Sequence, residues 1–281
     1  MILLKKINDL KTVLDRATIE GKDVSFVPTM GALHEGHLSL LKAAAGASRI
    51  VVVSIFVNPS QFNDPADFEK YPVTIEKDIT MLESGGCDVL FLPAVDEIYP
   101  RNRPEAVAFD LGFLERTLEG AFRPGHFQGV CQVMDRLLSI VQPQMLFMGQ
   151  KDYQQCMVVN RLIEIRKFDT ILYTCPTLRE TDGLAMSSRN MRLSEEERKN
   201  AVGLSAALSF IKKNLRQGNL SDTISKALDI LHDHQFKPDY LTVTDAKTLE
   251  QVKDWDGTQM LVALGAAFQG EVRLIDNMVL N

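Results

Sequence analysis

Short, very apolar segments alternate with helical patterns over residues 1–176, and this alternation constrains the fold more than any other feature. Runs rich in Val, Ile, Leu and Phe occur at 24–28, 49–56, 87–93, 144–149 and 170–176. Segments this apolar suit strands that are buried on both faces, as in a parallel sheet. Helical patterns lie between them, at 37–48, 74–86, 128–142 and 153–168. The alternation predicts a doubly wound α/β domain with a parallel sheet.

The pattern changes near residues 176–190. Residues 194–218 read as one long amphipathic helix, in which Ser194 and Glu197 have the spacing of a capping box. A second helix is expected at about 221–235. Strand-like segments follow at 239–245, 259–268 and 272–280. We therefore expect two domains, residues 1–176 and a smaller C-terminal α+β domain at 177–281.

Composition excludes several classes of protein. Of the 281 residues, 45% are hydrophobic and 24% are charged, which is the balance of an ordinary soluble globular protein. A net charge of −6 argues against a nucleic-acid partner. No run approaches the roughly 20 apolar residues that span a bilayer, and the first residues lack a secretory signal. The four cysteines form no C-x-x-C pair, so buried thiols in a reducing, cytoplasmic compartment are expected.

Residues 28–41, PTMGALHEGHLSLL, join the first of these apolar runs to a helix. The carboxyl end of a parallel strand is where open α/β sheets bind ligands. Gly31 and Gly36 allow close backbone approach, and the first turn of the helix offers unpaired N–H groups to a phosphate. Zinc binding is one alternative, but HEGH has a different spacing from H-E-x-x-H, and the other histidines show no partner pattern. Two merely packed histidines are the other alternative.

The HEGH tetrapeptide fits the H-x-G-H signature of the nucleotidylyltransferase superfamily, whose folds are Rossmann-like. Three further stretches, FVNPSQF (56–62), GQKDYQQ (149–155) and MSSRN (186–190), narrow the match. RPGHFQGV (123–130) and RLIDN (273–277) fit as well. In order and approximate spacing, over essentially the whole chain, these stretches resemble the pantothenate synthetases, also called pantoate–β-alanine ligases.

The resemblance implies that pantoate, β-alanine and ATP are converted to pantothenate, AMP and pyrophosphate through an acyl-adenylate, a step of coenzyme A biosynthesis. It implies small-molecule partners, with no membrane partner, and a homodimer. Mg²⁺ would be bound chiefly through the ATP phosphates, so no protein ligand is assigned to a metal. The reactive adenylate needs shielding from water, and we expect the C-terminal domain to close over the ATP site.

By the same resemblance, His34, His37 and Lys151 are the expected catalytic residues, with His37 in the family's role of proton donor. The positive end of the helix dipole disfavours imidazolium, so neutral rings would donate one N–H each to the triphosphate. Lys151 is a mobile charge for phosphate, and Asp152 can cap a helix or accept from the ribose. The residues expected to bind ATP are Met30, Gly31, Ala32, Leu33, His34, Glu35, Gly36, His37, Gly149, Gln150, Lys151, Asp152, Leu178, Met186, Ser187, Ser188 and Arg189.

Gln61 and Gln155 match the family positions that bind the hydroxyl and carboxylate groups of pantoate. Neutral amides suit a carboxylate that must act as a nucleophile. Arg123 and His126 are lesser candidates that border the site. Asp78 could be a metal ligand or, as easily, a solvated helical acid, so magnesium is left without an assigned protein ligand. Two positions depart from the family pattern: Gln150 stands where many relatives have glutamate, and Leu178 where they usually have valine.

Two other functions compete with the ligase. A nucleotidylyltransferase acting on another small acceptor would share HEGH but has no reason to carry FVNPSQF and GQKDYQQ. A nucleotide-binding regulator without turnover would not need both histidines, Lys151 and the MSSRN segment, in which two hydroxyls and a guanidinium suit phosphate oxygens.

Overall fold

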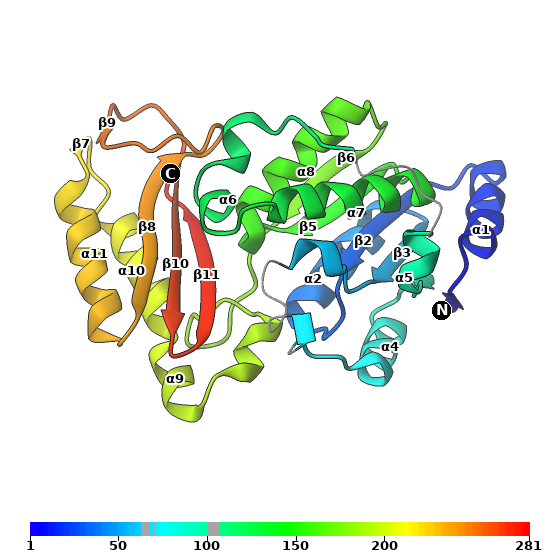
Figure 1. Cartoon of the computed structure of the whole chain (residues 1–281), viewed down its shortest axis with the longest axis horizontal. Helices are drawn as coiled ribbons and strands as arrows, with labels where there is room; N and C mark the ends of the chain where they lie inside the picture. The colour runs from blue at the N-terminus through cyan, green and yellow to red at the C-terminus, as the bar shows by residue number, and fades with distance from the viewer. Residues whose placement is uncertain (63–67, 70, 101–106) are drawn as a thin grey trace. The chain divides into compact units, whose positions relative to one another are not determined.

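The computed structural model describes residues 1–62, 68–69, 71–100 and 107–281. It contains two compact units (Figure 1). The N-terminal unit comprises residues 1–150 and 154–176, and the C-terminal unit comprises residues 151–153 and 177–281. The short segment 151–153 therefore departs from the domain division expected from the sequence. It belongs to the C-terminal unit because its groups hydrogen-bond there, as in the bond from Tyr153 Oη to the Ala246 carbonyl at 2.7 Å.

A six-stranded parallel sheet forms the centre of the N-terminal unit, in the order β1-β4-β3-β2-β5-β6. Its strands are β1 (Ile2–Leu4), β2 (Val24–Thr29), β3 (Ile50–Ile55), β4 (Val89–Phe91), β5 (Met145–Gly149) and β6 (Ile171–Cys175). All five predicted strands are present, and β1 is an additional edge strand. Because β2 lies between β3 and β5, the strand order reverses there, and the carboxyl ends of these three strands share one edge of the sheet.

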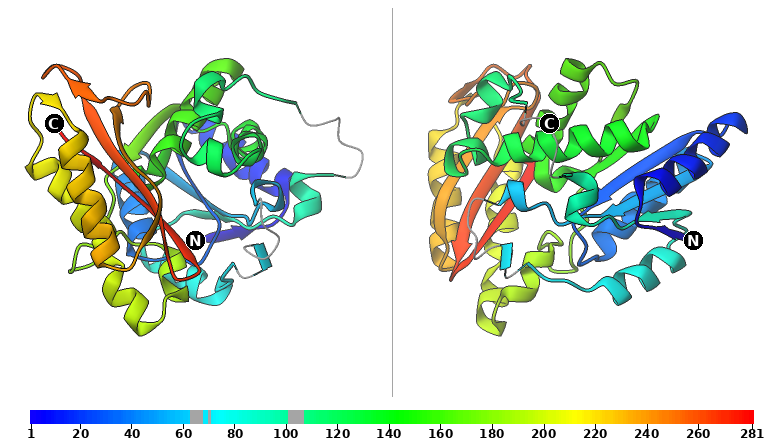
Figure 2. Two further views of the ribbon diagram at one scale, coloured as in Figure 1. Left: turned by 60° about the vertical axis from the view of Figure 1, so that its left-hand side comes forward. Right: turned by 45° about the vertical axis from the view of Figure 1, so that its right-hand side comes forward.

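Helices cover both faces of the central part of this sheet, which explains why β2, β3, β4 and β5 are apolar and mostly buried. The edge strand β6, expected from the sequence to be buried on both faces, is largely exposed. Phe26 of β2 packs in a core with α1 (Ile7–Ile19), α7 (His126–Val141) and α8 (Tyr153–Arg166). The next residue, Val27, points to the opposite face. There it packs in a second core with α2 (Glu35–Ala47) and α4 (Ile75–Ser84). The right-hand view of Figure 2 shows α7 (green) and α4 (cyan) on opposite sides of the blue strands. The predicted doubly wound fold is confirmed.

The C-terminal unit packs helices on an antiparallel sheet of order β11-β10-β8. Its main elements are α10 (Val202–Lys213), α11 (Ser221–Asp233), β8 (Lys237–Asp245), β10 (Leu261–Gln269) and β11 (Val272–Val279). A two-stranded ribbon joins β7 (Gly218–Asn219) to β9 (Asp254–Trp255). Leu208 of α10, Leu231 of α11 and Val243 of β8 are fully buried in one shared core. In Figure 2 the two yellow helices lie along the orange and red strands. This is the predicted small α+β domain.

The helix predicted over residues 194–218 is in fact two helices. The capping box is present: Ser194 Oγ accepts the N–H of Glu197 at 3.3 Å, and Glu197 Oε2 accepts the N–H of Ser194 at 2.8 Å. It begins α9 (Glu195–Asn200), which Ala201 separates from α10. The second helix ends at Lys213, where Asn214 Nδ2 bonds the Phe210 carbonyl at 2.9 Å and satisfies an acceptor of the last turn.

All four cysteines are thiols, and three of them are buried. Burial raises the pKa of Cys87 and of Cys131 to about 12. Cys175, at the end of β6, is partly exposed, and burial raises its pKa as well. Among the described residues, no helix is both long and apolar enough to cross a bilayer.

Burial predicts an order of thiol reactivity in the native protein. At pH 8 a disulfide reagent should label Cys175 first, because only the thiolate reacts and Cys87 and Cys131 are neither ionised nor accessible. Mass-spectrometric mapping of labelled peptides, with and without denaturant, measures this order. Equal labelling of all four thiols in the folded protein would contradict the buried placement.

Candidate active site

Two histidines cap the helix that follows β2. His34 is the N-cap residue of α2, with φ −144° and ψ 175°. Its Nδ1 accepts the N–H of Gly36 at 3.1 Å, and Nδ1 of His37 accepts the N–H of His34 at 3.3 Å. The two ring centroids are 4.1 Å apart. HEGH is therefore a capping box in which imidazoles take the places usually held by Ser and Glu.

These hydrogen bonds determine the tautomer of both rings. A ring nitrogen that accepts a hydrogen bond carries no proton, so each neutral ring is protonated at Nε2. In both His34 and His37 the protonated nitrogen is therefore Nε2. Protonation at Nδ1 would break a cap bond and place a cation at the positive end of the helix dipole. The cap bonds thus fit the neutral rings expected from the sequence, and their role as donors to a triphosphate stays a prediction.

Asp78 of α4 fixes the turn between β2 and this capping box. Its side chain is 0% exposed, and its carboxylate accepts the N–H groups of Ala32 and Leu33, each at 2.9 Å. Thr74 Oγ1 donates to the same carboxylate at 2.9 Å. Gly31 and Ala32 have φ values of +81° and +49°, a left-handed turn that needs such support. The interpretation of Asp78 as a solvated helical acid is therefore wrong.

The amides of this turn differ from the expectation of unpaired N–H groups. The N–H of Gly31 donates to Thr29 Oγ1 at 3.2 Å. Asp78 accepts from the next two amides of the turn, and the two imidazoles accept from the amides of His34 and Gly36. The amides with such acceptors are those of Gly31, Ala32, Leu33, His34 and Gly36. These five amides are already paired, so the phosphate cradle of unpaired backbone N–H groups expected from the sequence is not formed by them.

Gln61 is held at the end of the neighbouring strand β3, in the short helix η1 (Pro59–Gln61). Arg123 donates to His126 Nε2 at 3.2 Å, so His126 is protonated at Nδ1 and donates to the Gln61 carbonyl at 2.8 Å. The Gln61 amide nitrogen contacts Met30 Sδ at 2.7 Å. The structure thus brings together a residue expected to bind pantoate and one expected to bind ATP.

Helix α7 supports the same segment through a close backbone contact. A Cβ on Gly129 would collide with the Ser60 carbonyl. Asn58 Nδ2 donates to the Gly129 carbonyl at 3.1 Å, and Tyr99 Oη donates to Asn58 Oδ1 at 3.1 Å. The RPGHFQGV stretch therefore contributes His126 and Gly129 as supports for Gln61.

In helix α8, a buried glutamine lies beside the predicted one. Gln154 accepts the N–H of Glu119 at 3.0 Å and donates to the carbonyls of Leu114 and Thr117 at 2.8 and 2.9 Å. Sequence reasoning did not single out Gln154, since its partners lie 35 or more residues away. Gln155, partly buried, belongs to the N-terminal unit, as does Gln61. Its contact with pantoate stays a prediction.

The remaining predicted ATP residues belong mostly to the C-terminal unit. Ser187 caps η4 (Ser188–Arg192), and its Oγ accepts the N–H of Arg189 at 3.3 Å. The Met186 N–H donates to the Leu178 carbonyl at 3.0 Å, so a small hairpin brings these two predicted residues together. Lys151 lies in the same unit, whereas Gly149 and Gln150 belong to the N-terminal unit.

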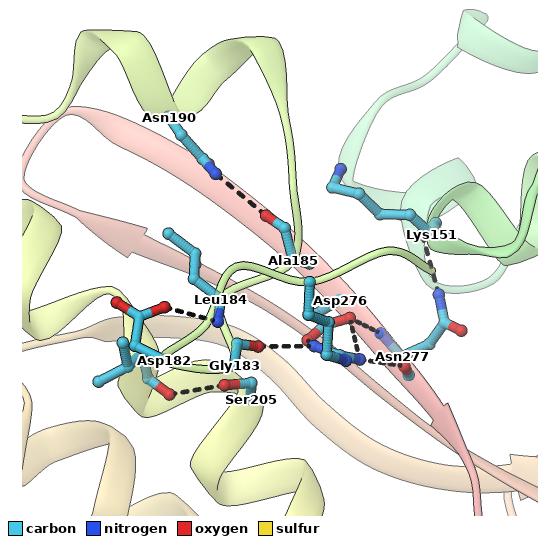
Figure 3. Close-up of polar contacts among 11 residues, drawn as sticks. Lys151, Asp182, Gly183, Leu184, Ala185, Asn190, Ser205, Asp276 and Asn277 are labelled. Atoms are coloured by element: carbon cyan, nitrogen blue, oxygen red, sulfur yellow. Dashed lines mark hydrogen bonds and ion pairs between the residues drawn. The ribbon is translucent and has the colours of Figure 1, made fainter. Parts of the chain in front are cut away.

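An ion pair between the buried carboxylate of Asp276 (Figure 3) and the partly exposed guanidinium of Arg179 anchors this hairpin to β11. Arg179 donates to both carboxylate oxygens of Asp276, at 2.6 and 3.0 Å, and to the Gly183 carbonyl at 3.1 Å. Burial raises the pKa of the Asp276 carboxyl, and the Arg179 guanidinium opposes that rise. Asp276 belongs to the RLIDN stretch, so this motif holds the segment that leads into MSSRN.

The parallel sheet and the histidine capping box at the end of β2 define a nucleotide-binding α/β enzyme of the H-x-G-H class. The family model described as pantoate-beta-alanine ligase matches residues 2–279. The chain therefore belongs to the pantoate–β-alanine ligase family, and it is an acid–amine ligase of that specificity. Family membership sets aside the nucleotidylyltransferase and the inactive regulator.

Curated relatives and solved structures agree with the family model. The pantothenate synthetase of Fervidobacterium nodosum is 44% identical, with 100% of each chain covered. That of Cytophaga hutchinsonii is 43% identical, over 100% of this chain and 99% of its own. A Thermus thermophilus structure superposes with a TM-score of 0.93 at 40% identity, covering 100% and 99%. The Francisella tularensis ligase, complexed with β-γ ATP and β-alanine, has a TM-score of 0.82 at 35% identity, covering 99% and 97%.

Replacement of Asp78 should disturb the turn that precedes the histidines. In Asp78→Asn one oxygen becomes an NH₂ group facing a backbone N–H, which should cost about 1.5–3 kcal/mol of unfolding free energy. The KM for ATP should rise, because His34 follows the disturbed turn. Denaturant titration and steady-state kinetics measure the two effects.

Glu76→Gln is the matched control, since Glu76 lies exposed on the same helix. It removes one carboxylate charge without touching the turn. If both variants behave alike, the loss reflects charge on α4 and not the hydrogen bonds to Ala32 and Leu33.

Proposed function

We propose that the chain condenses pantoate with β-alanine through a pantoyl-adenylate, releasing pyrophosphate and then AMP. The observation that carries this mechanism is the histidine capping box, whose bonds leave the proton of each neutral ring on Nε2. Two such donors at the carboxyl end of β2 suit a triphosphate. The ligand-bound Francisella tularensis relative supports ATP and β-alanine as substrates.

In the first step, a pantoate carboxylate oxygen attacks the α-phosphorus of ATP. A new phosphorus–oxygen bond forms, the bond to the β,γ-phosphates breaks, and pyrophosphate leaves with the electron pair. Negative charge then grows on the leaving group. Hydrogen bonds from His34 and His37 and the charge of Lys151 would stabilise it, so that positioning and electrostatics carry the step. The rings act as donors, and full proton transfer is not required.

In the second step, the β-alanine amine attacks the acyl carbon of the adenylate. The carbon–nitrogen bond forms, the bond to the AMP oxygen breaks, and the nitrogen loses a proton to give the amide. Water would hydrolyse the adenylate in competition with the amine. The ATP-binding set draws residues from both units, and we propose that the C-terminal unit closes on ATP to exclude water.

Gln61 and Gln155 would bind pantoate. An amide donates and accepts hydrogen bonds without carrying charge, so it can orient the substrate carboxylate without neutralising the nucleophile. Gln61 is held at both ends, because His126 donates to its carbonyl and Met30 Sδ contacts its side-chain amide. This agrees with a site in which pantoate lies next to the nucleotide.

Mg²⁺ would enter on the ATP phosphates and neutralise part of their charge. Over the described ranges, no group of three or more His, Cys, Asp or Glu side chains is placed to hold a metal ion. Asp78 is committed to the turn before α2. We also propose a cytoplasmic location, supported by the four free thiols, and a homodimer, which rests on the family resemblance.

Isotope exchange between pyrophosphate and ATP tests the adenylate. Exchange should require pantoate and proceed without β-alanine, because the first step is reversible and complete before the amine enters. Radiolabelled pyrophosphate incorporation into ATP measures it. Exchange in the absence of pantoate, or none under any condition, would rule out the proposed intermediate.

Two histidine variants separate chemistry from folding in this assay. His37→Ala should lose exchange by about 10²- to 10³-fold, as expected for removal of a donor to developing charge. His232→Ala, at an exposed position of α11, should retain exchange. Thermal melting of both variants checks that His37→Ala remains folded.

Gly129→Ala should weaken pantoate binding. The added methyl group meets the Ser60 carbonyl, so η1 and the side chain of Gln61 must shift. We expect the KM for pantoate to rise by about 10-fold or more, in line with the cost of misplacing a binding group. The KM for ATP should change far less. Initial-rate kinetics with each substrate varied in turn measure this split.

Gly46→Ala provides the matched control. Gly46 lies within α2, where an added Cβ meets nothing within 4 Å. This variant should keep both KM values and gain about 0.5–1 kcal/mol of stability from helix propensity. An equal rise of both KM values in Gly129→Ala would show that the change is not confined to the pantoate side.

A further inference from the structure

The backbone of Lys151 is held by a side chain near the end of the sequence (Figure 3). Asn277 of β11 is 2% exposed, and its Nδ2 donates to the Lys151 carbonyl at 2.9 Å. The two residues are 126 positions apart. This buried amide, bonded to a backbone carbonyl at such a separation, fixes the place of the single 3-10 turn η3 (Gln150–Asp152) that precedes α8.

Asn277 is itself rigidly placed by the Arg179–Asp276 ion pair. Its N–H donates to Asp276 Oδ1 at 2.8 Å, and its carbonyl accepts from Arg179 Nη2 at 3.3 Å. The same guanidinium makes two bonds to the Asp276 carboxylate. Charge-assisted, bidentate pairs of this kind have little freedom of orientation. The direction of the Asn277 amide therefore follows from a network that is already ordered.

A second bond ties the same segment to the C-terminal unit. Tyr153 Oη donates to the Ala246 carbonyl at 2.7 Å. Immediately afterwards, Gln154 is bonded to Glu119, Leu114 and Thr117 of the N-terminal unit. The three residues 151–153 are thus fixed within one unit by Asn277 and Tyr153, and the chain passes to the other unit between Tyr153 and Gln154.

A lysine ammonium is a point charge on a flexible four-carbon stem. Its reach is set by the position of its backbone, because the stem offers many rotamers around a fixed Cα. A displaced backbone would still carry the charge but would present it to the wrong phosphate oxygen. In a step dominated by positioning, such misplacement costs rate even when the charged group is intact.

We propose that Asn277 is a positioning residue for the adenylation step and acts through the backbone of Lys151. The inference rests on the proposed role of Lys151 toward the ATP phosphates. The RLIDN stretch then has two tasks: Asp276 pairs with Arg179 of the hairpin that leads into MSSRN, and Asn277 places the lysine.

A double-mutant cycle in the full chain tests the proposal, with pyrophosphate–ATP exchange in the presence of pantoate as the readout. Asn277→Ala should lower kcat/KM for ATP by about 10- to 100-fold, the cost of a misplaced group. Lys151→Ala should lower it at least as far. The double variant should lie within about 2-fold of Lys151→Ala, because a residue that acts only through Lys151 has nothing left to position.

Each other outcome overturns the inference, and the outcomes are distinguishable. If Lys151→Ala loses exchange and Asn277→Ala does not, Asn277 has no positioning role and the role of Lys151 stands. If Lys151→Ala retains exchange, the role of Lys151 itself fails. Multiplicative losses in the double variant would mean that Asn277 acts on the fold as a whole and not through the lysine.

Two further variants guard against a folding defect. Asn277→Asp keeps the side-chain shape but presents an acceptor to the Lys151 carbonyl, so it should lose exchange as well; full activity would overturn the proposal. Asn281→Ala removes a comparable amide bond, from Nδ2 to the Gln259 carbonyl at 2.9 Å, at an exposed position after β11. It should retain exchange, and an equal loss there would indicate a general effect on the sheet.

Discussion

The bond between a buried carboxylate and two backbone amides is the interaction on which the predicted nucleotide site depends. Asp78 accepts from Ala32 and Leu33, and so stabilises a left-handed turn directly after β2. After this turn, His34 has the extended backbone conformation that an N-cap residue requires. From there each imidazole is oriented by a backbone N–H. The direction of both Nε2–H groups is thus set by a chain of hydrogen bonds that starts in another helix.

The order of the strands in the parallel sheet brings further predicted residues close to this turn. Strands β2, β3 and β5 are neighbours, and each ends at the same edge with one of the predicted segments. The histidine loop follows β2, and the segment with Gln61 follows β3. Their contact through Met30 and Gln61 shows that the two predicted substrate sets meet within one unit. A parallel sheet makes such convergence a matter of strand order, because residues distant in sequence arrive at one edge together.

The strands and helix starts could largely be predicted from the sequence, because each depends on a pattern of a few neighbouring residues. Strands buried on both faces are apolar throughout, and the capping box at Ser194 is a four-residue signal. Strand β1 was missed because it is short and largely exposed, and the break at Ala201 leaves a continuous amphipathic pattern. Asp78, Gln154 and Asn277 were beyond reach for a common reason. Each is a polar side chain that bonds backbone groups 35 or more residues away, and nothing near it in the sequence marks it as buried.

The chain crosses between its two units at three points, after Gln150, after Tyr153 and after Pro176. The C-terminal unit is therefore discontinuous, and a cut at residue 177 would separate it from the lysine that it holds. Exchange of this unit between relatives at that boundary would pair Lys151 from one parent with Asn277 from the other. Recombination at the apparent domain junction thus changes the partner that holds the Lys151 backbone as well as the junction itself.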